Sequence, residues 1–378
     1  MKNIKLHFCI LCLSVMLLIL LMTGYELPSK QWLPSITAQY EGKCKTNASS
    51  LVALPVTTET PRLKGYIVYD CDDHHSGPCG GWSDRMSGMF SAYVISVLLH
   101  KHFLVRCTRS FNLTDYFIPN SIDWKYNSSL LVDMSSKYHN FFCKTPNAIK
   151  EKNLTSLKHL FTKDVDFVRI NWDYIKHFRE FQGIKKVIPW VSDLPFADIY
   201  LKFFNTLFKP TKIITEAVNK IVKNVTKLAC AHIRMGKSDT IIWDSTHTEE
   251  KQLKHVWIFL KTMEETNHSI FIATDAQFVR NTAKALFKHL LETKGRILHI
   301  DQRAGGDGLF GGYTKVFVDF FVLTKCDVLL LTKSGFGMMS AYLSIKSSDL
   351  YCLTPYEVVP CSRYTLQRFY PTQILSPV

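Results

Sequence analysis

Short apolar runs alternate with amphipathic stretches along most of the chain. Residues 65–70 (GYIVYD) and 103–107 (FLVRC) have the length and composition of buried strands. Between them, residues 85–102 place apolar side chains at every third or fourth position, a spacing that predicts an amphipathic helix. The regular part of the chain therefore begins with a strand, a loop, a helix and a second strand.

The second half of the chain repeats this alternation more clearly. Apolar runs predict four strands, at residues 227–233, 269–274, 296–300 and 327–332. Helical patterns lie between or after them, at about 247–265, 276–291, 313–325 and 337–345. Strands and helices that alternate at this spacing predict a parallel, doubly wound sheet covered on both faces.

The middle of the chain, from about 110 to 210, gives weaker signals. We predict strands only at 166–170 (DFVRI) and 185–191 (KKVIPWV). The expected fold class is α/β, with two Rossmann-like domains that face each other across a cleft. We place the N-terminal domain at residues 61–215 and the C-terminal domain at residues 216–378.

An uncharged apolar run, FCILCLSVMLLILLM, lies at residues 8–22 behind two lysines. With its flanks it is ~15 to 18 residues long, the lower limit for a membrane span. A cleaved signal peptide and an uncleaved anchor both fit, but residues 23–29 lack a small-residue cleavage pattern. We therefore predict a cytoplasmic tail (1–7), a signal-anchor transmembrane helix (8–23) and a stem (24–60). The rest would be luminal, in a single-pass type II Golgi membrane protein.

Sequons and cysteines support a luminal chain. Potential N-glycosylation sites occur at Asn47, Asn112, Asn127, Asn153, Asn224 and Asn267. Nine cysteines follow the apolar run, and an odd number leaves at least one that is free or joined to another chain. Cys71 with Cys79 and Cys352 with Cys361 are candidates for short-loop disulfides.

The formal net charge is +14, from 46 basic and 32 acidic residues. Such a charge suits nucleic acid, an anionic membrane surface or an anionic small ligand. A luminal chain meets little nucleic acid, and the basic residues are scattered, so we exclude a nucleic-acid partner. The charge then indicates either a solvated surface or attraction of a phosphate-bearing ligand.

The segments that follow the predicted strands are the candidate ligand-binding residues, because open α/β sheets bind ligands at the carboxyl ends of their strands. After 227–233 the sequence continues as HIRMGKSD, in which His232 and Arg234 share one face of the strand and Gly236 opens the turn. Arginine suits a diphosphate because its planar fork donates two parallel hydrogen bonds. The alternative is a core histidine beside a surface arginine.

Residues 333–337 (KSGFG) follow the most apolar strand. A serine hydroxyl, glycine N–H groups and the start of a helix together form an anion site, although a plain tight turn has the same composition.

The first loop, DCDDHHSGPCGGWSDR, is rich in acids and histidines. Metal ligands in proteins are usually two to four residues apart, and adjacent side chains diverge, so we predict no metal site here. We expect the acids at 70–73 to form a rim tethered by Cys71 and Cys79. Gly80, Gly81, Asp84 and Arg85 would face the ligand.

These motifs occur in an order that resembles a known group. The segments GGWSDRMSGMFSAYVISVLLHKHFLV, HIRMG, FIATD and LLTKSGFGMMSAYLS, spanning about 65–350, are similar to the fucosyltransferase superfamily that includes the α1,2-, core α1,6- and protein O-fucosyltransferases. The resemblance implies a GT-B-like fold, GDP-fucose as donor, inversion at the sugar carbon and no metal or other cofactor. It also implies a glycan or glycoprotein acceptor.

The resemblance implies roles for individual residues. Arg234 would hold the β-phosphate and stabilise the departing GDP. The other donor-binding residues would be His232, Gly236, Asp275, Ser334, Gly335, Phe336, Gly337, Gly81, Asp84 and Arg85. An acceptor hydroxyl also needs a general base within hydrogen-bond reach, for which Asp239 and Asp244 are candidates because they follow Arg234 on the same loop.

Two departures from the family pattern leave alternatives open. The run after the strand reads Met-Gly-Lys-Ser-Asp, which displaces the acid to Asp239, and Ser83 stands where a second glycine is usual. A luminal protein that binds nucleotide sugars or glycans without catalysis is one alternative. A transferase that uses another sugar nucleotide, such as a metal-dependent UDP-sugar enzyme, is the other.

Overall fold

The computed structural model describes residues 63–74, 77–237, 242, 244–301, 307–344 and 349–371. The predicted tail, membrane anchor and stem lie outside these residues, as do Asn47 and Asp239. Within the described ranges, no helix combines the length and apolar character that a membrane crossing needs. Pro61–Val378 forms a compact unit, and the description below concerns this unit.

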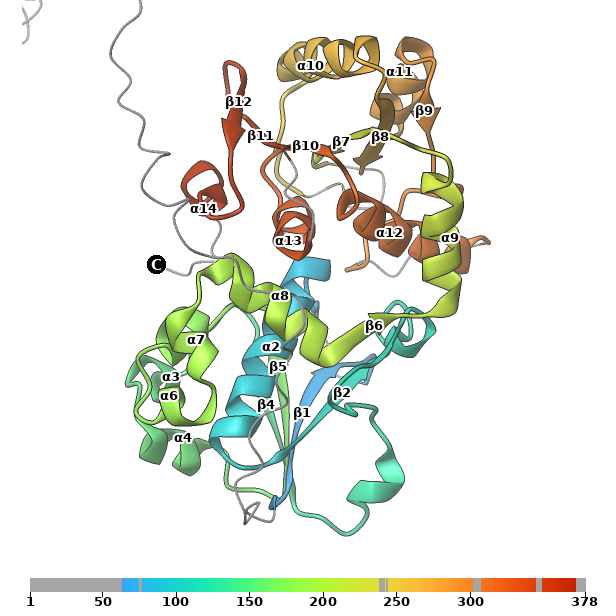
Figure 1. Cartoon of the computed structure of the whole chain (residues 1–378). Coiled ribbons are helices and arrows are strands. Elements are labelled where there is room, and N and C mark those ends of the chain that lie inside the picture. Colours follow the sequence, from blue (N-terminus) through green and yellow to red (C-terminus); the bar gives the residue numbers. More distant parts are fainter. Residues whose placement is uncertain are drawn as a thin grey trace, which may run out of the picture. The chain divides into compact units, whose positions relative to one another are not determined.

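The first half of the unit contains a four-stranded parallel sheet (Figure 1). Its order is β2 (His102–Cys107), β1 (Tyr66–Cys71), β5 (Val165–Ile170) and β4 (Ser136–Phe141). Helix α2 (Trp82–Leu98) connects β1 to β2 and packs on β1 and β5. The predicted strand–loop–helix–strand unit is confirmed, with the helix beginning three residues earlier than expected.

The second half contains a six-stranded sheet. Its order is β12 (Val358–Cys361), β11 (Asp349–Leu353), β10 (Val328–Leu331), β7 (Leu228–Ile233), β8 (Ser269–Thr274) and β9 (Leu290–Leu291). All neighbours are parallel except β11 and β12. From β7 the chain moves outward through β8 to β9, and β10 then returns to the other side of β7. The strand order thus reverses between β7 and β10, where such sheets bind ligands.

Helices pack around both sheets. In the second half these are α10 (Leu253–Glu265), α11 (Gln277–Leu286), α12 (Leu309–Leu323), α13 (Gly335–Leu343) and α14 (Leu366–Phe369). The region between the sheets is largely helical, with α3 (Asn147–Lys150), α4 (Leu154–Leu160), α5 (Ile175–Phe178), α6 (Ile184–Val187), α7 (Pro189–Asp193), α8 (Phe196–Leu207) and α9 (Lys212–Val222). A short antiparallel pair, β3 (Phe117–Pro119) with β6 (Phe208–Pro210), completes it.

Two predicted strands are wrong. Residues 185–191 belong to α6 and α7, where Ile184, Ile188 and Val191 are buried at three- to four-residue spacing and Pro189 begins α7. An isolated apolar run has the same composition whether it is a buried strand or a short buried helix. Residues 296–300 form no strand, and this segment instead runs to the first half of the chain, where Arg85 donates a hydrogen bond to the carbonyl oxygen of Ile300.

The two halves share a continuous apolar core. One cluster of buried side chains includes residues of β1 and β5 together with residues of β7 and β10. Trp82, at the first position of α2, stacks on Phe117 at 4.9 Å and packs edge-on against Phe317 of α12 at 5.0 Å. The halves are therefore joined directly beneath the carboxyl ends of their sheets.

Three disulfides lie in the described part of the chain. Cys71–Cys79 and Cys352–Cys361 confirm the predicted short loops. The third disulfide, Cys230–Cys326, joins β7 to the turn that precedes β10, and its cysteines are 96 residues apart. The sequence contains no signal for this pairing. The five described sequon asparagines are all exposed, as N-glycosylation requires.

Helix α2 approaches β5 so closely that only glycine fits at one position. A Cβ added to Gly88 would lie 1.9 Å from the carbonyl oxygen of Ile170. Because the obstacle is backbone, we expect Gly88→Ala to lower the free energy of unfolding by about 3 kcal/mol, measured by urea denaturation. Gly311→Ala in α12 is the control, since nothing lies within 4 Å of its added Cβ, and it should raise stability by up to about 1 kcal/mol. Equal midpoints for Gly88→Ala and the wild type would contradict this packing.

Candidate active site

A cavity of about 450 Å³ lies where the carboxyl ends of the two sheets meet. The first half contributes residues 80–84 and Phe142. The second half contributes the ends of β7 and β8, the segment 298–301, one face of α12 and the start of α13. Nine of the site residues predicted from the sequence line this cavity: Gly81, Asp84, His232, Arg234, Asp244, Asp275, Ser334, Gly335 and Phe336.

Arg234 is the main cation of this site. Its Nη1 donates to Asp275 Oδ2 at 2.8 Å, and its Nη2 donates to Asp244. The Arg234 side chain is 13% exposed, so these ion pairs are only partly hydrated. Its backbone N–H donates to Thr332 Oγ1 at 2.8 Å, which joins the end of β7 to the end of β10. Both terminal nitrogens of the guanidinium therefore donate to carboxylates, at the point where the strand order reverses.

The two acids that pair with Arg234 differ in how firmly they are held. Asp275 also accepts hydrogen bonds from the N–H groups of Met235 at 2.8 Å and Gly236 at 3.0 Å. These bonds fix the turn that presents Arg234. The described side-chain contacts of Asp244 are to Arg234 and to His247 at 3.4 Å. Asp244 is therefore the carboxylate that an incoming anion displaces more easily.

Two helices begin at the cavity. The N-terminus of α2 contributes Gly81 to Asp84, and the N-terminus of α13 contributes Ser334 to Phe336. A Cβ on Gly335 would lie 2.3 Å from the Ser83 hydroxyl, so the two helix starts are in close contact. The Ser334 side chain makes no capping bond to its own helix. Together the two helix starts present N–H groups and partial positive charge to an anion.

Two histidines of the site are uncharged near neutral pH. Burial and the nearby Arg234 lower the pKa of His299 to about 4. Burial likewise lowers the pKa of His232 to about 4, with Arg234 adding to the effect. His232 stacks on Phe336 at 5.2 Å, and its Nδ1 has no hydrogen-bond partner among the described residues. Both rings can bind a ligand by hydrogen bonds without adding charge.

Arg85 does not line the cavity, unlike its neighbour Asp84. It is fully buried and donates to three carbonyl oxygens, those of Gly80 at 3.1 Å, Arg109 at 3.0 Å and Ile300 at 2.8 Å. The bond to Ile300 ties the start of α2 to the segment 298–301 of the second half. Asp301 completes the link by accepting from the N–H groups of Cys79 and Gly80, both at 2.9 Å. Arg85 thus lies among backbone carbonyl groups and not in the cavity wall, where the sequence placed it.

The acids of the first loop are also placed differently from the prediction. Asp70 and Asp72 are buried, and both pair with Arg106, at 2.6 and 3.2 Å. Only Asp73 is exposed, 3.8 Å from Arg109. The predicted tethered rim is therefore wrong for Asp70 and Asp72, whose charges stabilise the pairing of β1 with β2.

The remaining predicted residues lie near or outside the cavity wall. Gly236 and Gly337 support it, since a Cβ on Gly337 would come 2.8 Å from the His232 ring. Asp239 lies outside the described residues. Three further residues that line the cavity, His299, Asp301 and Asp319, are not among the predicted site residues. Asp301 directly follows the predicted strand 296–300, which is a signal for a ligand-binding position, whereas His299 and Asp319 are single polar residues within apolar patterns.

Comparisons with known proteins support the fold. No model of a known protein family matches the sequence, and no curated protein is detectably similar to it in sequence. Among solved structures, an arginine-to-lysine mutant of FUT1 from Arabidopsis thaliana in complex with GDP is similar, with a TM-score of 0.52 and 12% identity, over 83% of this chain and 74% of that one. The fucosyltransferase NodZ from Bradyrhizobium gives a TM-score of 0.46 and 11% identity, over 79% of this chain and 99% of that one.

The FUT1 comparison alone carries the fold assignment. At this identity it shows that the two chains share an arrangement of two α/β halves, as we predicted, and it assigns no residue roles.

Proposed function

We propose that the protein is an inverting glycosyltransferase that transfers fucose from GDP-fucose to a hydroxyl group of a glycan or glycoprotein. One observation carries the proposal: Arg234, the Ser334–Phe336 turn and the start of α2 line a single cavity in a chain with the fold of FUT1. The FUT1 structure is a GDP complex, which supports a guanosine diphosphate donor here.

The diphosphate would bind where the positive groups meet. Its oxygens would take the place of Asp244 on Arg234, while Asp275 keeps its backbone bonds and holds the arginine in position. The start of α13 would donate further N–H groups. As the bond between fucose and phosphate breaks, negative charge grows on the β-phosphate, and these groups stabilise it. This arrangement needs no divalent cation to neutralise the leaving group.

Asp319 provides a contact that suits guanine. One of its carboxylate oxygens pairs with Lys315 at 2.6 Å, and the other has no hydrogen-bond partner among the described residues. Guanine presents two neighbouring N–H donors on its Watson–Crick edge, which a carboxylate oxygen accepts. Uracil presents only one N–H between two carbonyl groups. An oxygen that accepts one N–H group of guanine has the second N–H group beside it, whereas in uracil it would have a repelling carbonyl group on either side, so Asp319 would favour GDP over UDP.

Inversion follows from a single displacement. With GDP held by the second half, the acceptor would approach the sugar carbon from the first-half side, which contributes residues 80–84 and Phe142. A single backside attack then reverses the configuration at that carbon.

We also propose that the catalytic unit is luminal, in a single-pass type II Golgi membrane protein anchored by residues 8–23. The three disulfides suit an oxidising compartment, and the five exposed sequons suit a glycosylating one.

The test is a donor panel on the purified full chain in detergent. We expect GDP-fucose to be hydrolysed slowly in the absence of acceptor, with full activity in EDTA and GDP binding at least tenfold tighter than UDP. Hydrolysis of UDP-sugars that EDTA abolishes would overturn both the donor and the metal-independent mechanism. Tight GDP binding with no turnover on any acceptor would favour the alternative, a nucleotide-sugar-binding protein without catalysis.

A further inference from the structure

Four of the carboxylates that line the cavity are already engaged. Asp244 and Asp275 pair with Arg234, Asp301 accepts from two backbone N–H groups, and Asp319 pairs with Lys315. All four belong to the second half of the chain, and each already contacts a cation or backbone N–H groups.

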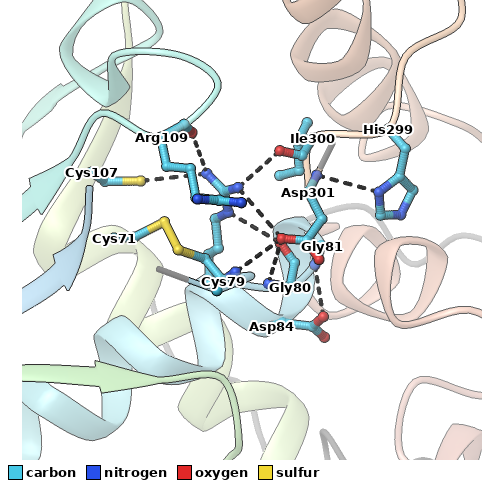
Figure 2. Close-up of polar contacts among 12 residues, drawn as sticks. Cys71, Cys79, Gly80, Gly81, Asp84, Cys107, Arg109, His299, Ile300 and Asp301 are labelled. Atoms are coloured by element: carbon cyan, nitrogen blue, oxygen red, sulfur yellow. Dashed lines mark hydrogen bonds and ion pairs between the residues drawn. A yellow bond between two sulfur atoms is a disulfide. The ribbon is translucent and has the colours of Figure 1, made fainter. Parts of the chain in front are cut away.

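Asp84 is different. It lies in the first turn of α2, and its Oδ2 accepts the N–H of Gly81 at 2.7 Å (Figure 2). Its Oδ1 is buried and has no hydrogen-bond partner among the described residues. One oxygen thus fixes the orientation of the carboxylate, and the other, on a side chain that lines the cavity, has no hydrogen bond to offset its burial.

The electrostatic surroundings of Asp84 suit proton transfer near neutral pH. Burial raises its pKa to about 7, the N–H of Gly81 opposes this, and the charge of Asp301 raises it further. The cations Arg85 and Arg234 act in the lowering direction. His232 and His299, with pKa values of about 4, are uncharged in this range and are weaker bases. A base whose pKa lies near the working pH transfers protons efficiently.

Asp84 and Arg234 reach the cavity from different halves of the chain. Asp84 belongs to the first half and Arg234 to the second, and both line the same cavity. A backside attack needs the acceptor and the leaving group on opposite sides of the sugar carbon. With the diphosphate on Arg234, an acceptor entering from the first half would bring its hydroxyl toward Asp84.

We propose that Asp84 is the general base that accepts the proton of the acceptor hydroxyl through Oδ1. The acceptor oxygen then bonds to C1 of fucose while the bond from C1 to the phosphate oxygen breaks. The electron pair of that bond leaves with GDP, and the proton remains on Asp84 until solvent removes it. This assignment rests on the proposed function, and it replaces Asp244 as the base because Asp244 lies beside Arg234, where the diphosphate would bind.

The experiment compares the wild-type full chain with Asp84→Asn. Asparagine keeps the size of the side chain and an oxygen that can accept the N–H of Gly81. The variant should therefore fold like the wild type, and its dissociation constant for GDP should stay within about threefold of the wild-type value. The kcat of fucose transfer should fall by about 10²- to 10⁴-fold. Asp73→Asn is the control, an exposed acid before the same loop, and it should leave kcat unchanged.

The pH profile provides a second readout that needs no variant. Since the base must be ionised, wild-type kcat should rise with pH up to an apparent pKa near 7, and at pH 6 about a tenth of the molecules would hold ionised Asp84. In Asp84→Asn the residual kcat should no longer rise with pH over this range. A wild-type profile that is flat from pH 5.5 to 8, or an Asp84→Asn enzyme that retains kcat, would overturn the assignment while leaving the transferase function intact. Absence of transfer by the wild type would overturn both.

Discussion

Replacing Arg234 by alanine should lower kcat/KM for fucose transfer about a thousandfold. The guanidinium is the main cation of the cavity, and it is held by two carboxylates at the point where the strand order reverses. In the proposed mechanism it stabilises the charge that develops on the departing diphosphate. Removal of a single preorganised donor of this kind typically costs 10²- to 10³-fold in rate. Arg234 also contributes its full charge, so we expect the upper end of that range.

Arg234→Lys separates charge from geometry. Lysine keeps the positive charge but cannot donate two parallel hydrogen bonds. We expect it to recover GDP affinity to within about tenfold of wild type while kcat stays about 10²-fold low. Steady-state kinetics and calorimetric titration of GDP measure the two effects. An alanine variant with wild-type kcat/KM would show that the diphosphate does not bind at Arg234, whatever the donor is.

The second large effect concerns stability. Removing the Cys230–Cys326 disulfide by a double alanine substitution should lower the free energy of unfolding by about 4.7 kcal/mol. This bond closes a loop of 96 residues, and the chain-entropy model gives that magnitude for loops of about 100 residues. Both cysteines are fully buried, between the central strand β7 and the start of β10. Without this bond, the segment that forms α10, α11 and α12 gains conformational freedom in the unfolded chain.

The matched control is the removal of Cys352–Cys361, which closes a loop of only nine residues. The same model gives about 2.6 kcal/mol for this bond. Urea denaturation of the two double variants under oxidising conditions should therefore separate them by about 2 kcal/mol. A larger loss from Cys352–Cys361 would contradict the entropic account of the long-range bond.

The central strands and the segments that follow them could be predicted from sequence. The runs at 227–233, 269–274 and 327–332 lie in strands buried on both faces, so their apolar character is continuous and local. Parallel strands place their carboxyl ends at one edge, and this geometric rule brought His232, Arg234, Ser334 and Gly335 together before any contact was known. The strands β4, β11 and β12 were missed because they are shorter or carry exposed polar positions.

The sequence could not predict which of the two side chains, Asp84 or Arg85, lines the cavity. The residues are adjacent and both follow a glycine-rich loop, yet one lines the cavity and the other is buried in hydrogen bonds to Gly80, Arg109 and Ile300. The last of these partners lies 215 positions away. Sequence periodicity describes which face of an element is apolar, and it contains no information about which distant backbone group will meet that face.

The ion pairs of the acidic residues also depend on the tertiary structure. Asp244, a candidate base from its sequence position, pairs with Arg234, and Asp70 and Asp72, expected on an exposed rim, pair with Arg106. In each case the cation beside an acid decides what its carboxylate contacts. Residue type and local pattern thus account for the strands and the motifs at their ends. The pairing of those motifs, and with it the choice of Asp84 as the proposed base, follows from contacts between segments far apart in the chain.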